Sequence, residues 1–322
     1  MNSVQNGMIA LARSTFVSRW MRRLGKRTAL AKRFVGGTDL DRALGTAVNL
    51  FARYGIRASL FYLGEYVLER AAIEQNVSQA LAAIDALTQA GLDIHVSIDP
   101  TAVGFMTSRD YGSANATRIA QHAARQPVVT GHERRVMLDM EDLSMRDRTC
   151  ELHNALSEQD LPVALTLHAR QRRTCDDLRR LVDLPTAVRL VKGAFPASPA
   201  HDFSGRAAID EAYFEAARLM LSRQARDAGF YPAFGTHDDR LAVSIIELAR
   251  RHGWAPEQFE FEMLYGVRTD WQLKLRSMGY RVRVYLPFGD DWWPYAARRV
   301  GEQPRNAWLL ARSAIGNGYG FG

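Results

Sequence analysis

The chain has 322 residues, of which 47% are hydrophobic, and a formal net charge of +7. It lacks a run of about 18 apolar residues, the length that a membrane-spanning helix needs, so we expect a soluble protein. Residues 1–34 contain eight of the 42 lysine and arginine residues and no acid, which leaves 34 basic against 35 acidic residues elsewhere and argues against a nucleic-acid-binding body.

The first 34 residues are expected to form a basic arm or surface helix. Their arginine-rich, acid-free composition also resembles a transit peptide, and their charge would allow peripheral contact with an anionic membrane. After Thr38, acids in the first turn and apolar residues at helical spacing predict a helix that ends near Gly55. A stretch rich in Ala and Leu predicts a second helix from about Asn76 to Gln89, closed by Gly91.

Short apolar stretches then alternate with segments of helical periodicity. The predicted strands are Ala58–Gly64, His95–Asp99, Val136–Met140, Val163–Leu167, Val188–Lys192, Pro232–His237, Phe259–Tyr265 and Arg283–Pro287. Alternating β and α segments indicate a parallel sheet, and eight repeats favour a closed barrel. No G-x-G-x-x-G follows a strand, which disfavours an open dinucleotide-binding sheet. We therefore predict an α/β fold in which residues 35–322 form one (β/α)8 TIM-type barrel.

Polar side chains stand at the predicted carboxyl ends of the strands, where barrel enzymes place their chemistry. They are Asp99, Asp139, Glu141, Asp142, His168, Lys192, Thr236, His237 and Tyr285. This pattern predicts one shared polar mouth. The two cysteines, Cys150 and Cys175, show no metal-binding spacing, so we predict structural thiols in a reducing cytoplasm and no metal site.

Two segments are candidates for ligand binding. Arg189 and Lys192 precede Gly193 and Ala194, whose small side chains leave room for a planar anionic cofactor; the alternative is a buried strand with a turn glycine. In the helix predicted after Asp291, Tyr295 shares one broad face with Arg298 and Arg299. Paired guanidinium groups suit a carboxylate, although such a pair can also be a solvated surface feature.

Six ordered motifs give the chain a resemblance to the proline dehydrogenase family, from about Arg33 to Asn306. The motifs are Leu138–Asp142, Arg189–Ala194, Ala233–Asp238, Phe259–Gly266, Arg283–Gly289 and Trp293–Arg299, the last followed by Glu302 and Pro304. The resemblance implies a distorted (β/α)8 barrel with an N-terminal helical extension. It also implies a bound FAD that accepts a hydride at N5 from C5 of L-proline, giving 1-pyrroline-5-carboxylate.

The resemblance also implies roles for single residues. Asp139 and Arg189 would be catalytic. The substrate would be bound by Asp99, Leu264, Tyr285, Tyr295, Arg298 and Arg299, the last two holding its carboxylate. FAD would be lined by Met140, Leu167, His168, Lys192, Gly193, Ala194, Thr236 and His237. A quinone or another electron acceptor would reoxidise the enzyme, which is expected in the cytoplasm with at most peripheral membrane association.

The chain departs from the family pattern at three of these sites. Asp99 stands where a lysine is usual. Asp99 could bind an arginine and weaken proline binding, the substrate could be a modified proline (an ester, amide, carrier-bound or amine-bearing form), or activity could be lost, leaving a non-catalytic flavoprotein. His168 replaces a glutamine, so its charge, and with it the flavin potential, is expected to vary with pH. Glu262 also replaces a glutamine, and the sequence assigns it no role.

Overall fold

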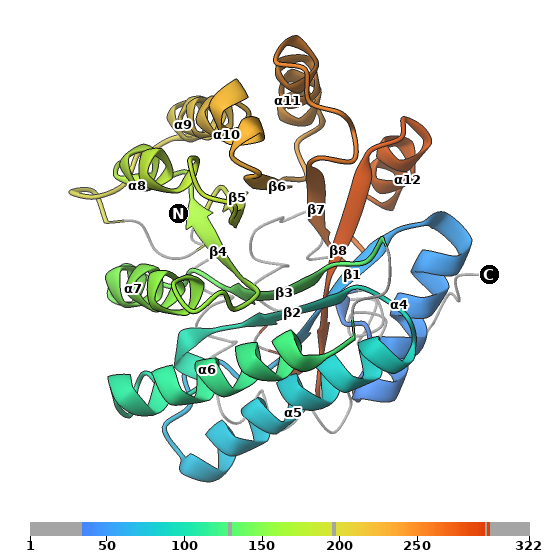
Figure 1. The fold of residues 1–322 in the computed structure, drawn as a ribbon, viewed down its shortest axis with the longest axis vertical. Coiled ribbons are helices and arrows are strands. Elements are labelled where there is room, and N and C mark those ends of the chain that lie inside the picture. The colour runs from blue at the N-terminus through green and yellow to red at the C-terminus, as the bar shows by residue number, and fades with distance from the viewer. Residues whose placement is uncertain (1–33, 128–130, 195–197, 294, 297–322) are drawn as a thin grey trace, which may run out of the picture.

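The computed structural model describes residues 34–127, 131–194, 198–293 and 295–296, and within them the chain forms a closed barrel of parallel strands (Figure 1). The strands follow one another around the barrel in chain order, and β1 pairs with β8 to close it. They are β1 (Arg57–Tyr62), β2 (Ile94–Ile98), β3 (Arg134–Leu138), β4 (Val163–His168), β5 (Ala187–Val191), β6 (Tyr231–Gly235), β7 (Glu260–Leu264) and β8 (Arg281–Phe288). The predicted barrel is confirmed, whereas the N-terminal arm lies outside the described residues apart from Phe34.

Helices surround the barrel and connect its strands (Figure 1). They are α4 (Leu40–Tyr54), α5 (Arg70–Gln89), the 3-10 helix η2 (Pro100–Ala102), α6 (Arg109–Arg125), α7 (Arg146–Ser157), α8 (Thr174–Leu181), α9 (Arg206–Met220), α10 (Arg223–Asp227), α11 (Asp239–Arg251) and α12 (Thr269–Ser277). The predicted start of α5 at Asn76 is wrong by six residues. Its N-cap, Glu69, makes no side-chain capping bond, so the usual start signal is missing.

Polar and apolar residues alternate along most strands. The apolar residues at every second position, such as Leu60, Val96, Val188 and Val284, pack in the main core cluster with residues of the helices. The intervening positions are mostly polar, and many of them are also buried, such as Ser59, His95 and Thr166. Because successive side chains of a strand point to opposite faces, these polar residues fill the barrel interior. Branched apolar residues usually fill that space, so this interior is unusual for the fold.

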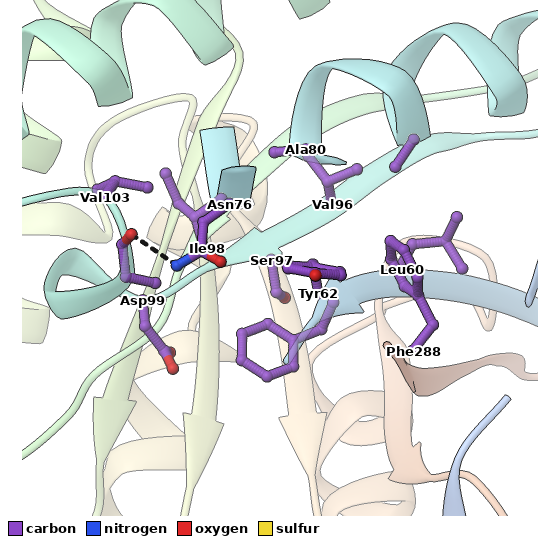
Figure 2. Close-up of a pocket in the computed structure, with 13 residues that line it drawn as sticks. Leu60, Tyr62, Asn76, Ala80, Val96, Ser97, Ile98, Asp99, Val103 and Phe288 are labelled. Carbon is purple, nitrogen blue, oxygen red and sulfur yellow. Dashed lines mark hydrogen bonds between the residues drawn. The ribbon is translucent and has the colours of Figure 1, made fainter. Parts of the chain in front are cut away.

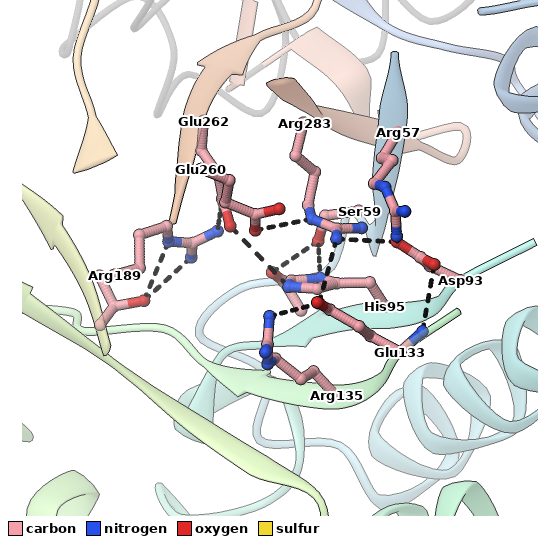
Figure 3. Close-up of polar contacts among 12 residues, drawn as sticks. Arg57, Ser59, Asp93, His95, Glu133, Arg135, Arg189, Glu260, Glu262 and Arg283 are labelled. Atoms are coloured by element: carbon pink, nitrogen blue, oxygen red, sulfur yellow. Dashed lines mark hydrogen bonds and ion pairs between the residues drawn. The ribbon is translucent and has the colours of Figure 1, made fainter. Parts of the chain in front are cut away.

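Ion pairs between strands close the amino-terminal end of the interior (Figure 3). Arg283, which is fully buried on β8, donates to Glu260 and to Asp93, each at 2.9 Å, and to the carbonyl oxygen of Ala58 at 3.1 Å. Arg57 forms a second ion pair with Asp93. We call Arg283, Asp93 and Glu260 the floor triad. Through these contacts Arg283 links β8 to β7, to the start of β2 and to β1.

Candidate active site

Four side chains from four parts of the wall meet at the carboxyl end of the barrel interior. Asp139 follows β3, Thr166 lies on β4, Arg189 on β5 and Tyr285 on β8. The guanidinium of Arg189 forms an ion pair with Oδ1 of Asp139 and donates to the Thr166 hydroxyl at 3.0 Å. The Tyr285 hydroxyl donates to Oδ2 of Asp139 at 2.9 Å. These contacts fix both oxygens of one carboxylate in the mouth of the barrel.

Burial governs the ionisation of this cluster. It raises the pKa of Asp139, while the Arg189 cation and the hydrogen bonds from Tyr285 and Thr166 oppose that rise. The pKa of Tyr285 lies well above its usual value because of burial and the nearby charges of Asp139 and Asp99. For Arg189, burial acts to lower the pKa, but the carboxylates of Asp139 and Glu262 outweigh it and raise the pKa overall. Arg189 therefore remains a cation.

Acidic residues line the β2 and β3 side of the mouth. Asp99 follows β2, is 6% exposed, and its charge contributes to the raised pKa of Tyr285. Glu141 accepts hydrogen bonds from the Thr101 amide at 2.8 Å and from its hydroxyl at 2.5 Å. Burial, against those hydrogen bonds, raises the pKa of Glu141 to about 8.

Basic residues lie on the β4 and β5 side. Lys192 forms ion pairs with Asp210 and Asp238 while its side chain remains 31% exposed. Arg170, which follows β4, lies 3.7 Å from Asp202. Each of these cations thus lies beside a carboxylate, so the β4 and β5 side carries charges of both signs.

His168, at the end of β4, does not behave as the sequence suggested. It is 4% exposed, and burial, opposed by a hydrogen bond with the Met140 backbone, lowers its pKa to about 4. The imidazole is therefore neutral across the physiological range. The expectation that its charge varies with pH near neutrality is wrong, because burial disfavours the cation.

The remaining predicted residues divide into two groups. Thr236 and His237 follow β6, and Nε2 of His237 accepts from the Leu264 amide at 3.0 Å, joining two predicted site residues at the ends of β6 and β7. Gly193, in the left-handed region at φ 102°, and Ala194 follow β5. The side chains of Met140 and Leu167 differ, because both belong to the main core cluster. The packing of these two side chains favours a structural role.

Aromatic residues cover the β1 and β8 side of the mouth. Trp293 and Tyr295 pack with Phe61 in one buried cluster, and Tyr285 packs against it. The rings of Phe61 and Tyr285 are 5.2 Å apart. This cluster brings Trp293 and Tyr295 next to Tyr285. Arg298 and Arg299 lie outside the described residues.

A small cavity lies beside the mouth, between β1, β2 and α5 (Figure 2). Its volume is about 20 Å³, and its lining includes Leu60, Val96 and Ala80, with Asp99 at one end. Asn76 borders it and donates to the carbonyl oxygens of Gly64 and Ala102, each at 2.9 Å. Such a volume suits a water molecule and excludes an amino-acid substrate.

Sequence reasoning missed Thr166 and assigned no role to Glu262, although both contact Arg189. The available signal was the polar and apolar alternation of the strands, as in Val163–His168 and Glu260–Leu264. Inward positions can be read from that period once a barrel is assumed. Their partners across the barrel cannot be read in the same way.

Comparison with known proteins gives one consistent family. The proline dehydrogenase family model matches residues 44–311. Proline dehydrogenase 2 of Bacillus subtilis (strain 168) is 33% identical over 296 residues, which cover 92% of this chain and 93% of that protein. Proline dehydrogenase of Deinococcus radiodurans is 35% identical over 291 residues, covering 89% and 90%. A more distant relative, the carbapenem antibiotics biosynthesis protein CarD of Pectobacterium carotovorum, is 25% identical over 306 residues, covering 84% of this chain and 77% of CarD.

The fold also has a solved counterpart. The chain superposes on proline utilization A of Bdellovibrio bacteriovorus, solved after inactivation by N-propargylglycine, with a TM-score of 0.77 and 19% identity. The match covers 99% of this chain and 43% of that one, so the chain spans less than half of that larger protein. At this identity the likeness concerns the barrel fold alone. Among the described helices, none has the length and apolar character needed to cross a bilayer.

Proposed function

Because this chain belongs to the proline dehydrogenase family, a family of flavin-dependent oxidoreductases acting on CH–NH bonds, we propose that it oxidises L-proline to 1-pyrroline-5-carboxylate with FAD as cofactor. The observation that carries this proposal is the cluster of Asp139, Tyr285 and Arg189 in the barrel mouth. It offers an anchored carboxylate for the substrate amine and a buried cation for an electron-rich cofactor. When bound, the flavin supplies the hydride acceptor.

The donor set of the site fits an anionic flavin nucleotide. Lys192 and Arg170 supply cationic groups at the ends of β4 and β5, where Asp210, Asp238 and Asp202 lie beside them. His168, at the end of β4, and Thr236, after β6, are both buried and offer neutral hydrogen-bonding groups. We therefore propose that these residues, with Gly193, Ala194 and His237, hold FAD. For Met140 and Leu167 we propose contacts through the backbone, since their side chains pack in the core.

Asp139 is proposed to bind and orient the substrate amine. Its Oδ1 is occupied by Arg189 and Thr166, whereas Oδ2 accepts from Tyr285 and belongs to a side chain that is 12% exposed at the mouth. Burial raises the pKa of Asp139, which makes this oxygen a better proton acceptor for an ammonium group. An amine that has lost its proton to Oδ2 has the free electron pair that hydride loss from the adjacent carbon requires.

The opposite end of the substrate is assigned to the segment after residue 291. We propose that Arg298 and Arg299 hold the carboxylate, because paired guanidinium groups bind carboxylates with two parallel hydrogen bonds. Tyr295 and Leu264 would border the pocket, and the packing of Tyr295 in the cluster over the mouth supports this. The same aromatic cluster would exclude water from that side.

Asp99 supports a second candidate substrate. It is an anion, 6% exposed, whose charge reaches Tyr285 at the mouth, and an anion there disfavours a free carboxylate nearby. A modified proline, such as an ester, an amide, a carrier-bound prolyl group or an amine-bearing analogue, would avoid that repulsion. A flavoprotein without turnover is the third candidate.

The electron acceptor and location complete the proposal. We propose a quinone as acceptor and a cytoplasmic protein that meets the membrane surface at most peripherally, with residues 1–34 as its basic arm. The described helices offer no membrane span, so a contact of this kind would use the surface of the protein.

The first experiment is the visible spectrum of the purified protein under anaerobic conditions, before and after addition of L-proline. Bleaching of a bound flavin band would support proline oxidation. A flavin band that persists with proline but bleaches with proline methyl ester or prolinamide would support the second candidate, and Asp99→Lys should then gain activity on L-proline. Persistence with every analogue would leave the non-catalytic flavoprotein, and absence of flavin after incubation with FAD would contradict the cofactor.

A further inference from the structure

Arg189 carries a second carboxylate that the proposed reaction does not use. Its Nη1 donates to Oε2 of Glu262, on β7, at 2.8 Å (Figure 3), whereas its Nη2 forms the ion pair with Asp139. The Glu262 side chain is 2% exposed, compared with 12% for Asp139. Asp139 therefore faces the mouth, and Glu262 lies enclosed in the barrel interior beneath it.

The other oxygen of Glu262 faces a buried histidine. Oε1 of Glu262 and Nε2 of His95 are 3.8 Å apart, and neither atom has a hydrogen-bond partner. Nδ1 of His95 lies 2.8 Å from the Ser59 hydroxyl. Burial, with the cations of Arg283, Arg135 and Arg189 around it, lowers the pKa of His95 well below its usual value. In the tautomer that carries the proton at Nε2, this proton points toward Glu262 and Nδ1 accepts from Ser59.

A metal ion is the rival occupant of this place. Ligand atoms of His95, Glu260 and Glu262 lie within 4.8 Å of one another, and all three residues are buried. Each carboxylate, however, already accepts from a guanidinium, Glu260 from Arg283 and Glu262 from Arg189. A divalent cation would have to displace those donors and would add positive charge beside them. The contacts favour a hydrogen-bonded charge network.

We propose that Glu262 is a positioning residue. It binds the guanidinium of Arg189 from the barrel interior and partly neutralises the positive charge that Arg189 presents to the cofactor. This inference rests on the proposed function, which puts the flavin beside Arg189. A cation stabilises the electron-rich reduced flavin, and an anion bound to that cation weakens the effect. The contact of Glu262 with Arg189 thus lowers the reduction potential of the flavin and favours onward transfer of its electrons.

Glu262→Gln tests the proposal, because it removes the charge and keeps the size of the side chain. The bound flavin should become easier to reduce by about tenfold in the two-electron equilibrium, a shift of about 30 mV to more positive potential. The matched control is Glu260→Gln, two residues earlier on β7, equally buried and also paired with an arginine, but with Arg283 in place of Arg189. Its flavin potential should equal that of the wild-type protein.

Potentials are measured by anaerobic dye-linked titration of the flavin band, after flavin content has been determined. If Glu262→Gln binds flavin and its reduction potential equals that of the wild-type protein, this inference is overturned and the proposed function stands. The same holds if Glu262→Gln and Glu260→Gln shift the potential equally. Wild-type protein that binds no flavin would overturn both. If Glu262→Gln does not fold, Glu262→Asp, which withdraws the carboxylate from Arg189, should shift the potential in the same direction, and no shift would again refute the role. Zn²⁺ or Mn²⁺ that binds the wild-type protein but not Glu262→Gln would reassign the cluster as a metal site.

Discussion

The Tyr285 hydroxyl is the contact whose removal most directly tests the site. Tyr285→Phe deletes the hydrogen bond to Oδ2 of Asp139, which spans 2.9 Å, and keeps the ring. The packing of that ring against Phe61 and its position 5.3 Å from the Arg189 guanidinium should therefore persist. The variant isolates one hydrogen bond to one carboxylate.

The expected magnitude follows from that bond. A hydrogen bond to a charged group contributes about 1.5–3 kcal/mol, and one pKa unit corresponds to about 1.4 kcal/mol. The bond from Tyr285 lowers the pKa of Asp139, so its loss should raise that pKa by about one to two units. If Asp139 must be ionised to accept the substrate ammonium, kcat/KM should fall at low pH, with the acidic limb of its pH profile displaced upward by the same amount.

The assay is anaerobic reduction of the bound flavin by L-proline, or by the analogue that reduces it, from pH 5 to pH 9. Tyr265→Phe is the control, since burial alone raises the pKa of Tyr265 and its amide merely donates to the Tyr285 carbonyl. An acidic limb that stays in place in folded, flavin-bound Tyr285→Phe would refute the role of Asp139 as amine acceptor.

Two further predictions concern stability. Arg283→Met removes the cation of the floor triad from the buried carboxylates of Asp93 and Glu260, so the free energy of unfolding measured in urea should fall by about 3–5 kcal/mol. A fall below about 1 kcal/mol would mean that the triad rearranges without cost. For Glu141, the folded state retains a proton between the usual pKa of 4.5 and about 8, so its contribution to stability declines as pH rises through that window, on the order of 5 kcal/mol in total. Glu141→Gln should flatten this slope in unfolding curves measured from pH 5 to pH 8, and an unchanged slope would contradict the raised pKa.

Much of the fold could be predicted because the barrel strands are short segments with apolar residues at every second position, separated by segments of helical periodicity. The helix from Leu40 was also predictable, since Asp39 caps it and Gly55 ends it in the left-handed region at φ 63°. The start of α5 was missed because Arg70 follows Glu69, which makes no capping bond. The start of a helix is hard to predict from the sequence where no capping residue marks it.

The candidate site was predictable only in part. Asp139, Arg189 and Tyr285 could be proposed because motifs at strand ends identify them, and the structure brings the three together. The contact of Arg189 with Glu262 could not be foreseen, since β5 and β7 are not neighbours and the contact depends on the register of the closed barrel. The neutrality of His168 likewise depends on burial, which one sequence motif does not specify.

The floor triad has a consequence for how the chain is made. Arg283 lies 190 residues after Asp93, and its bond to the Ala58 carbonyl spans 225 residues. A nascent chain that has synthesised β1 to β7 can pair Asp93 with Arg57, but it lacks Arg283, the arginine that binds both Asp93 and Glu260. Contacts between such distant segments form late, because the loop between their ends must first be closed. The barrel can therefore close only when β8 is present. Chains truncated before β8 should remain open and accessible to proteases.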